Sequence, residues 1–114
     1  MRRLPALLPT VLMAVPAVAL GAAGDAAKGK PIYSAQCVTC HGKTGDGNGP
    51  VGRALSPRPT DFTKGDLAPD ERLFKVIRKG GKSVGLSKDM DAYPALTDDQ
   101  IWDVIAYIKT LVKK

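Results

Sequence analysis

The two cysteines and the single histidine of this chain lie within five consecutive residues, Cys37-Val38-Thr39-Cys40-His41. With only two cysteines, the chain cannot build the framework of several disulfides that stabilises many small exported domains. A structural zinc site needs four ligands, usually Cys and His, and this cluster has no second half elsewhere in the chain. The pentapeptide therefore requires a chemistry that uses two neighbouring thiols and one imidazole together.

Two cysteines separated by two residues and followed directly by histidine are the signature of covalent haem attachment. Thiols three positions apart on a helical turn can bond to the two vinyl groups of one porphyrin, and the next residue presents an imidazole to the iron. A thioredoxin-like pair would follow a strand, and a plain disulfide would not explain the adjacent histidine. The sequence predicts one haem c, held covalently by Cys37 and Cys40 and ligated by His41.

The first 23 residues are predicted to be a secretory signal peptide, and residues 24–114 one domain. A basic start precedes an apolar run and then small residues, which fits cleavage after Ala23, with Ala19 as the second choice. The alternative is an uncleaved membrane anchor. However, the apolar run is shorter than the roughly 20 residues of a spanning helix, and prolines interrupt it. We therefore expect export to the periplasm and no membrane span after cleavage.

The charge balance indicates protein partners and not nucleic acid. The formal net charge is +6, and it falls to +4 when Arg2 and Arg3 leave with the signal peptide. No basic stripe interleaved with aromatic residues is present, as a nucleic-acid surface would require. A modest positive surplus suits docking to acidic patches on redox partner proteins. Lys43, Lys82 and Lys88 are predicted to lie around the exposed haem edge.

Helix signals and hydrophobic spacing predict an all-α fold with long loops. Helices are expected over 25–40, from Pro69 to Lys79, and after Thr97, where a Thr-x-x-Gln capping box begins the last helix. Residues 42–59 are rich in Gly and Pro, and 81–96 form a second loop. Because the core of so small a domain is marginal, we expect three to four helices with long loops around one haem.

Met90 is the candidate for the sixth ligand of the iron. Met1 and Met13 leave with the signal peptide and His41 is the only histidine, so Met90 is the one soft neutral ligand that remains. It stands in a polar loop, where a gap-filling role is the alternative. The lysines of this loop are protonated near neutral pH and are poor ligands. Ligation by His and Met raises the reduction potential and closes the iron to substrates, which favours electron transfer.

The chain resembles the class I cytochromes c, in particular the small bacterial periplasmic members, over nearly all of residues 24–114. The resemblance rests on the Cys37-to-His41 motif, on Met90 in a late loop and on a closing helix that ends in Tyr107-Ile108-Lys109. It implies the cytochrome c fold, in which the first and last helices cross. Gly29 and Tyr107 occupy the positions that meet at the crossing, with Tyr33 beside them.

The resemblance also implies a proline whose carbonyl accepts a hydrogen bond from the haem-ligating histidine. Pro50 is the best match, and Pro57 and Pro59 are alternatives.

Arg53 and Arg58 are candidates to pair with haem propionates, although a solvated loop arginine is the commoner case.

The ligand loop departs from the pattern of many relatives, in which a proline and then an aromatic residue follow the methionine. Here the order is Met90-Asp91-Ala92-Tyr93-Pro94, with the aromatic residue present and the first proline absent. The sequence therefore does not explain what makes this loop rigid.

We expect a monomeric periplasmic electron carrier that is not an enzyme. The alternative is a dedicated cytochrome c subunit of a periplasmic redox enzyme complex, which would use the same residues. A third possibility, a haem enzyme or gas sensor with an open iron site, requires Met90 to be free. The single histidine and the lack of a distal acid–base residue count against it.

Overall fold

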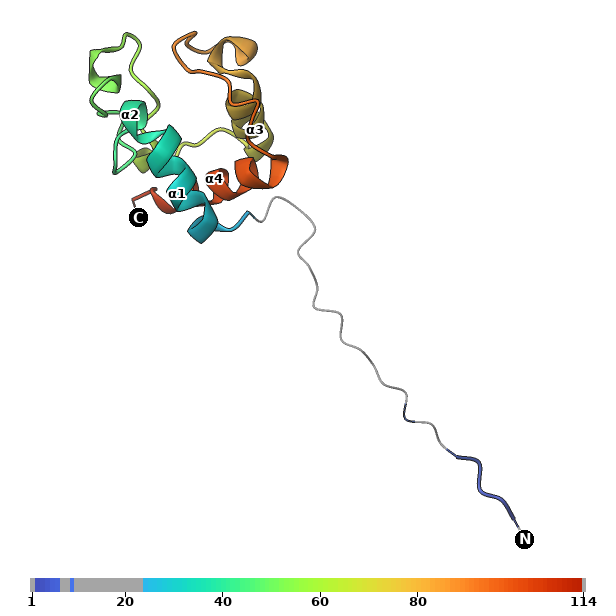
Figure 1. Cartoon of the computed structure of the whole chain (residues 1–114). Coiled ribbons are helices and arrows are strands. Elements are labelled where there is room, and N and C mark those ends of the chain that lie inside the picture. Colours follow the sequence, from blue (N-terminus) through green and yellow to red (C-terminus); the bar gives the residue numbers. More distant parts are fainter. Residues whose placement is uncertain (1, 7–8, 10–23, 114) are drawn as a thin grey trace.

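The computed structural model describes residues 2–6, 9 and 24–113. Its helices are α1 (Ala26–Gln36), α2 (Val38–His41), α3 (Asp70–Lys79) and α4 (Asp98–Thr110), shown in Figure 1. Short 3₁₀ turns occur at Gly52–Ala54, Phe62–Lys64 and Gly81–Val84. In this part of the chain no strand forms, and no helix is long and apolar enough to cross a membrane. The predicted all-α fold with long loops is confirmed, whereas the predicted cleavage site after Ala23 lies outside the described residues.

Helices α1 and α4 cross at the centre of the domain (Figure 1). Gly29 lies at the crossing, where a Cβ atom would be 1.9 Å from the carbonyl oxygen of Asp103 on α4. Beside this contact, Tyr33 packs against Tyr107 with ring centroids 5.2 Å apart. The crossing predicted at Gly29, Tyr33 and Tyr107 is confirmed, and it depends on the absence of a side chain at Gly29.

The buried core consists of a few large side chains, most of them on α4. The α4 members follow the spacing of one helix face, and they are Ile101, Val104, Ile105 and Ile108. The cluster is completed by Tyr33 of α1, by Phe62 of the 3₁₀ turn before α3, and by Ile77 of α3. The core is as small as expected for the length of the chain.

Helix α3 packs against α4, and both helices begin close to their predicted positions. Pro69 caps α3 and Asp70 is its first residue, so the start is one position later than predicted. Lys109 of α4 forms an ion pair with Asp70 at 2.6 Å. At the start of α4, the Thr97 side chain accepts a hydrogen bond from the Gln100 backbone, and the Gln100 side chain accepts one from the Thr97 backbone. The predicted capping box is confirmed.

The helix predicted over 25–40 is divided in two at Cys37, and its second part, α2, ends at His41. The loop that follows α2 and the loop that follows α3 stand on opposite sides, above the crossing of α1 and α4 (Figure 1). The fold therefore places α2 and its motif between the two long loops.

Candidate functional site

Helix α2 brings the two thiols and the imidazole of the motif to one face. The backbone N–H groups of Cys40 and His41 both donate to the carbonyl of Cys37, at 3.3 and 2.9 Å. Residues three and four positions apart on a helical turn are neighbours on its surface. All three side chains are half-buried. The local helical turn therefore directs both sulfur atoms and the ring into the same space.

The environment of the thiols does not favour the redox-pair and zinc alternatives. Burial, with a smaller effect from nearby Cys40, raises the pKa of the Cys37 thiol to about 12. Such a thiol stays protonated at neutral pH, whereas reactive cysteines have a lowered pKa. Among the described residues, no group of three or more His, Cys, Asp and Glu side chains could hold a metal ion. The motif instead presents two thiols, that of Cys37 protonated, and one imidazole.

The glycine-rich loop after α2 folds back over the end of that helix. The N–H of Gly47 donates to the carbonyl of His41 at 2.8 Å, and the N–H of Gly49 donates to the carbonyl of Cys40 at 3.1 Å. Gly52 approaches so closely that a Cβ atom would lie 1.9 Å from the Cys40 carbonyl oxygen. These bonds satisfy carbonyl groups that a helix end leaves without partners. The loop thus holds the motif rigidly from behind.

The His41 ring is fixed by two residues of the segment that leads toward α3. It stacks on Phe62, with ring centroids 4.4 Å apart and an interplanar angle of 17°. Its Nδ1 atom lies 3.2 Å from the carbonyl oxygen of Thr60. When Nδ1–H donates to this carbonyl, Nε2 keeps its lone pair for a metal. Burial lowers the pKa of His41, against the smaller raising effect of the Thr60 hydrogen bond, so the ring is kept neutral.

The prediction that Pro50 supplies this hydrogen-bond acceptor is wrong. Pro50 is exposed, and the N–H of the next residue, Val51, donates to the carbonyl of Thr39 at 2.9 Å. This bond ties the turn at Pro50 to the backbone of α2 and not to the imidazole. The acceptor is Thr60, one residue beyond the alternative candidate Pro59.

A cavity of about 330 Å³ opens in front of the motif. Ligand sites in proteins typically have volumes of roughly 300 to 1,000 Å³ and mainly apolar walls. The walls come from α2, from the loop before α3, from α3 and from the loop after it. They include Cys37, Cys40, His41 and Met90, together with the apolar side chains of Leu55, Pro57, Pro59, Phe62, Leu67, Leu73, Val76, Ile77, Leu86 and Ile108.

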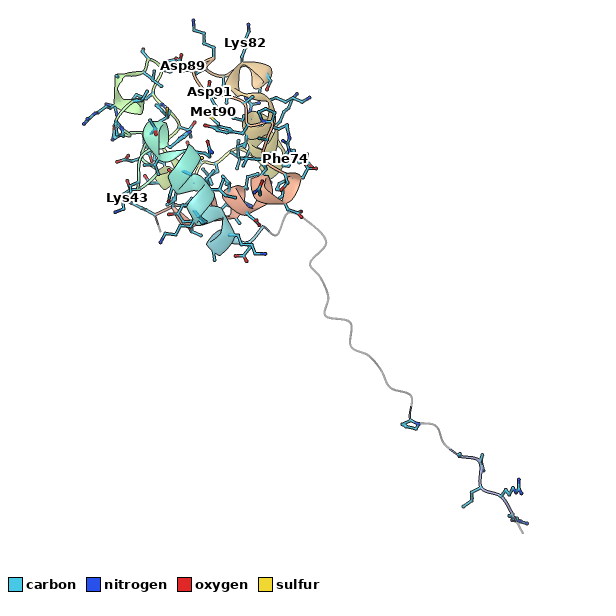
Figure 2. All side chains as sticks on the ribbon, in the orientation of Figure 1. Lys43, Phe74, Lys82, Asp89, Met90 and Asp91 are labelled. Atoms are coloured by element: carbon cyan, nitrogen blue, oxygen red, sulfur yellow. The ribbon has the colours of Figure 1, made fainter. Side chains whose placement is uncertain are left out.

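Met90 reaches this cavity from the loop after α3, where Figure 2 shows it beside the helix. Its side chain is half-buried and packs against the core, whereas those of Asp89 and Asp91 on either side are exposed. The carbonyl of Met90 accepts a hydrogen bond from the N–H of Gly81 at 3.0 Å. The structure thus brings the four predicted site residues, Cys37, Cys40, His41 and Met90, to one cavity.

Residues 24–108 match the family model described as cytochrome c oxidase, cbb3-type, subunit III. The chain belongs to the cytochrome c family. Cytochrome c-554(547) of Halothiobacillus neapolitanus is 32% identical over 95 residues, which cover 78% of this cytochrome and 99% of that protein. Among solved structures, a chain of the reducing HAO-like protein complex of Kuenenia stuttgartiensis has a TM-score of 0.63 and 28% identity. That match covers 75% of this cytochrome and 41% of the other chain.

Membership of this family implies haem c, and the residues of the cytochrome fit such a group. Thiols, an imidazole and a thioether are the side chains that attach and ligate haem iron, and here they line one mainly apolar cavity. Arg58 and Arg72 also line it and place positive charge where propionates could bind, whereas Arg53 does not line it. Arg58 already donates a hydrogen bond to the side chain of Asn48.

Two of the lysines predicted around the haem edge, Lys43 and Lys82, lie on different sides of the cytochrome. Figure 2 shows Lys82 beside Asp89 at one end of the domain and Lys43 at the other. Lys43 comes two residues after the end of α2, and none of the three lysines lines the cavity. The ring of Lys43, Lys82 and Lys88 around the haem edge stays a prediction.

Sequence reasoning missed the residues that hold the two predicted ligands in place. Thr60 and Phe62 fix the ring of His41, and Arg78 and Tyr93 fix the segment after Met90. A backbone carbonyl such as that of Thr60 has no residue-type signature. For Phe62 the one available signal was that the cytochrome has few aromatic residues, so that each of them was a candidate for a contact at the site.

Proposed function

We propose that this cytochrome carries single electrons with one haem c, bonded through thioethers to Cys37 and Cys40 and ligated by His41 and Met90. The observation that carries the proposal is that these four side chains, from two separate segments of the chain, line one apolar cavity. When bound, the haem supplies an iron that accepts and returns one electron. The residues of the cytochrome would attach it, ligate its iron and exclude water.

The roles of the two axial residues differ. His41 is held by Thr60 and Phe62, so its Nε2 has a fixed direction. Met90 offers a neutral, soft sulfur atom, which favours the ferrous state and raises the reduction potential. With His41 and Met90 both bound to the iron, substrates would not reach it. We therefore propose electron transfer and no enzymatic activity.

We further propose that the cytochrome is exported to the periplasm, is cleaved after Ala23, and works as a monomer with redox partners that present acidic patches. The basic, apolar and small-residue order of the first residues supports export, and the positive net charge supports acidic partners. Lys82→Glu and Lys88→Glu should slow electron transfer at low salt and flatten its salt dependence. Lys43→Glu makes the same charge change on another side of the domain (Figure 2) and tests whether the docking surface extends to that side.

A second candidate function is that of a dedicated subunit of a periplasmic redox enzyme complex. The observation that favours it is the likeness to a chain of the HAO-like complex, of which this cytochrome covers 41%. Gel filtration and co-purification from the native host separate the two functions. A free carrier elutes alone, whereas a subunit remains with its enzyme.

The proposal is tested by expression of the cytochrome together with a c-type maturation system. Intact-protein mass spectrometry should show one added haem, and Cys37→Ser or Cys40→Ser should each remove one thioether bond. The oxidised protein should show the weak far-red absorbance of sulfur bound to ferric iron. Absence of the added haem mass would contradict covalent attachment.

Ligation by methionine is tested separately with Met90→Ala. The variant should keep its covalent haem but lose the far-red band and bind carbon monoxide or cyanide rapidly at neutral pH. Leu86→Ala, at another side chain of the same loop that lines the cavity, serves as the control and should keep the band. Rapid cyanide binding by the wild-type cytochrome would instead favour an open iron site.

A further inference from the structure

The segment that follows Met90 has little regular structure of its own. Asp91, Ala92, Pro94 and Ala95 are exposed, and no helix begins before Asp98. The sequence also lacks the proline that follows the methionine in many relatives. Whatever holds the ligand loop must therefore come from another part of the cytochrome.

The C-terminal end of α3 supplies this support through its backbone. The N–H of Gly81 donates to the carbonyl of Met90 at 3.0 Å, and the carbonyl of Ile77 accepts from the N–H of Tyr93 at 2.9 Å. These two bonds fix the loop at the ligand and three residues after it. They leave the residues from Pro94 to Thr97 without a backbone partner on α3.

One side chain of α3, Arg78, makes contact with this turn. Its Nη1 donates to three successive parts of the turn, the carbonyl oxygens of Tyr93 at 3.3 Å, Pro94 at 3.2 Å and Leu96 at 2.6 Å. Its Nη2 forms an ion pair with the carboxylate of Asp98 at 2.7 Å. A single guanidinium therefore gathers the chain between the ligand loop and α4.

The guanidinium is itself held in place. Its side chain is 23% exposed, whereas that of Asp98 is 75% exposed, and its central carbon lies 5.8 Å from the centre of the Phe74 ring. Phe74 packs against Trp102 of α4, with ring centroids 4.7 Å apart. Arginine suits this position because its planar fork presents several donors at fixed angles and stays charged at all relevant pH values. A lysine ammonium would not present the same planar set of donors.

We propose that Arg78 is a positioning residue that keeps Met90 at the iron, by binding the carbonyl groups of the turn from Tyr93 to Leu96. The inference rests on the proposed ligation by His41 and Met90. Arg78 does not touch the cavity itself, so it acts through the loop. In this cytochrome a contact from α3 takes the place of the stiffening that a proline after the methionine would give.

The test compares Arg78→Gln and Arg78→Lys with the wild-type holoprotein, at temperatures where far-ultraviolet circular dichroism shows that all helices are intact. The measured quantities are the far-red band, the reduction potential and the rate at which cyanide displaces the methionine. Loss of a charge-assisted hydrogen-bond network of this size should accelerate displacement by about tenfold or more. The potential should fall, because the methionine spends less time on the iron.

Two further variants make the test specific. Asp98→Asn removes the ion pair but leaves the three carbonyl contacts, and should accelerate displacement by less than Arg78→Gln. Lys109→Gln breaks the ion pair to Asp70 at the other end of α3 and should leave cyanide displacement unchanged. Acceleration by Lys109→Gln equal to that of Arg78→Gln would show a general loss of stability and would overturn the inference.

Failure of the inference and failure of the proposed ligation give different results. A wild-type protein without the far-red band contradicts ligation by Met90. A wild-type protein with the band, and Arg78 variants that melt earlier yet bind cyanide at the wild-type rate, contradicts the role of Arg78 alone. Arg78→Lys keeps the positive charge, so the comparison remains available if Arg78→Gln does not fold.

Discussion

The two sides of the cavity are built in different ways. On the His41 side, helix α2 and the glycine-rich loop after it lie within some twenty residues of sequence and are joined by backbone hydrogen bonds to consecutive carbonyl groups. On the Met90 side, an irregular loop depends on the end of α3 and on the side chain of Arg78. The imidazole is therefore held by dense local structure and the thioether by a few longer-range contacts.

This difference indicates which side can open without unfolding. Local opening is easiest where few apolar contacts and exposed hydrogen bonds hold a segment, and that description fits the loop from Leu86 to Thr97. We expect substitutions on the His41 side to lower global stability. On the Met90 side, comparable changes should first affect ligation.

The largest contrast is expected between two glycine substitutions. In Gly52→Ala, the new Cβ would lie 1.9 Å from the backbone oxygen of Cys40, inside the rigid motif. Overpacking of this kind costs about 3 kcal/mol, which lowers Tm by roughly 12 °C or more in a domain of this size. The neighbouring exposed change Ala54→Ser should have little effect, and thermal denaturation of the holoprotein measures both.

In Gly81→Ala, the Cβ would lie 2.1 Å from the carbonyl oxygen of Ser87 and 3.0 Å from the Cβ of Met90. The irregular loop can move to relieve the clash, so the expected cost is only about 1 kcal/mol, at the low end of overpacking. The far-red band should nevertheless weaken, because the loop that carries Met90 shifts. Equal losses of Tm in the two glycine variants, with the band kept in both, would show that the two sides are equally rigid.

A second contrast uses one aromatic residue from each side. Phe62→Leu removes the ring that stacks on His41 and should cost about 1 to 2 kcal/mol, from the lost aromatic pair and the smaller volume. Phe74→Leu removes a ring that packs at a tilt against Trp102, at a similar cost. Urea denaturation measures both losses. Paramagnetic NMR shifts of the His41 ring should change in Phe62→Leu and stay unchanged in Phe74→Leu.

The sequence predicts the His41 side better than the Met90 side, because the structure of the His41 side is local in the sequence. The motif from Cys37 to His41 is contiguous, so helical geometry alone places its side chains. Gly29 and Tyr107 could be matched as the helix crossing through the resemblance to the class I cytochromes c, and the contact between Gly29 and α4 confirms it. The starts of α3 and α4 followed from Pro69 and from the Thr97 capping box to within one residue.

The supporting contacts could not be predicted, because they join segments with no shared pattern. The acceptor for His41 is a carbonyl, and any residue at position 60 would supply one, so the search for a proline selected Pro50. Arg78 lies in the last turn of α3, where a basic residue is common for its effect on the helix dipole alone. Its contacts with the turn after Tyr93 depend on how α3 packs, and the spacing of hydrophobic residues in the sequence does not reveal that packing.

A smaller contrast concerns two tyrosine hydroxyl groups. The buried Tyr33 hydroxyl donates to the carbonyl of Gly42 at 2.7 Å, and the Tyr93 hydroxyl donates to the carbonyl of Gln36 at 2.9 Å in a more exposed position. Tyr33→Phe leaves a buried carbonyl without its donor and should cost about 1.5 kcal/mol, whereas water can replace the Tyr93 hydroxyl and Tyr93→Phe should cost about 0.5 kcal/mol. Chemical denaturation measures both values. A larger loss of stability in Tyr93→Phe than in Tyr33→Phe would contradict this. It would indicate that the hydrogen bond between the Met90 loop and α1 stabilises the domain more than the one on the motif side.

The smallest effect concerns acid stability, and it belongs to the His41 side. Hydrogen bonds from the Thr63 hydroxyl and backbone lower the pKa of Asp61 below its ordinary value of 3.8, and a backbone hydrogen bond from Asn48 does the same for Asp46. Because the pKa is lower in the folded state, the contribution to stability is complete above the unfolded value near 3.8. It is lost as the pH falls through the lower, folded value.

Asp61→Asn keeps an oxygen acceptor but cannot titrate, so its stability should depend less on pH below about 4 than that of the wild type. Thr63→Val removes the hydroxyl donor and should return the pKa of Asp61 toward its ordinary value, which carboxyl carbon NMR titration measures directly. Denaturation midpoints between pH 5 and pH 2 then report the change in slope. An unchanged slope in Asp61→Asn would mean that the acid response arises elsewhere, and that the segment between the glycine-rich loop and α3 is not fixed by this carboxylate. Since Thr60 and Phe62 flank Asp61, such a result would also weaken the argument that this short segment is the rigid support of the imidazole.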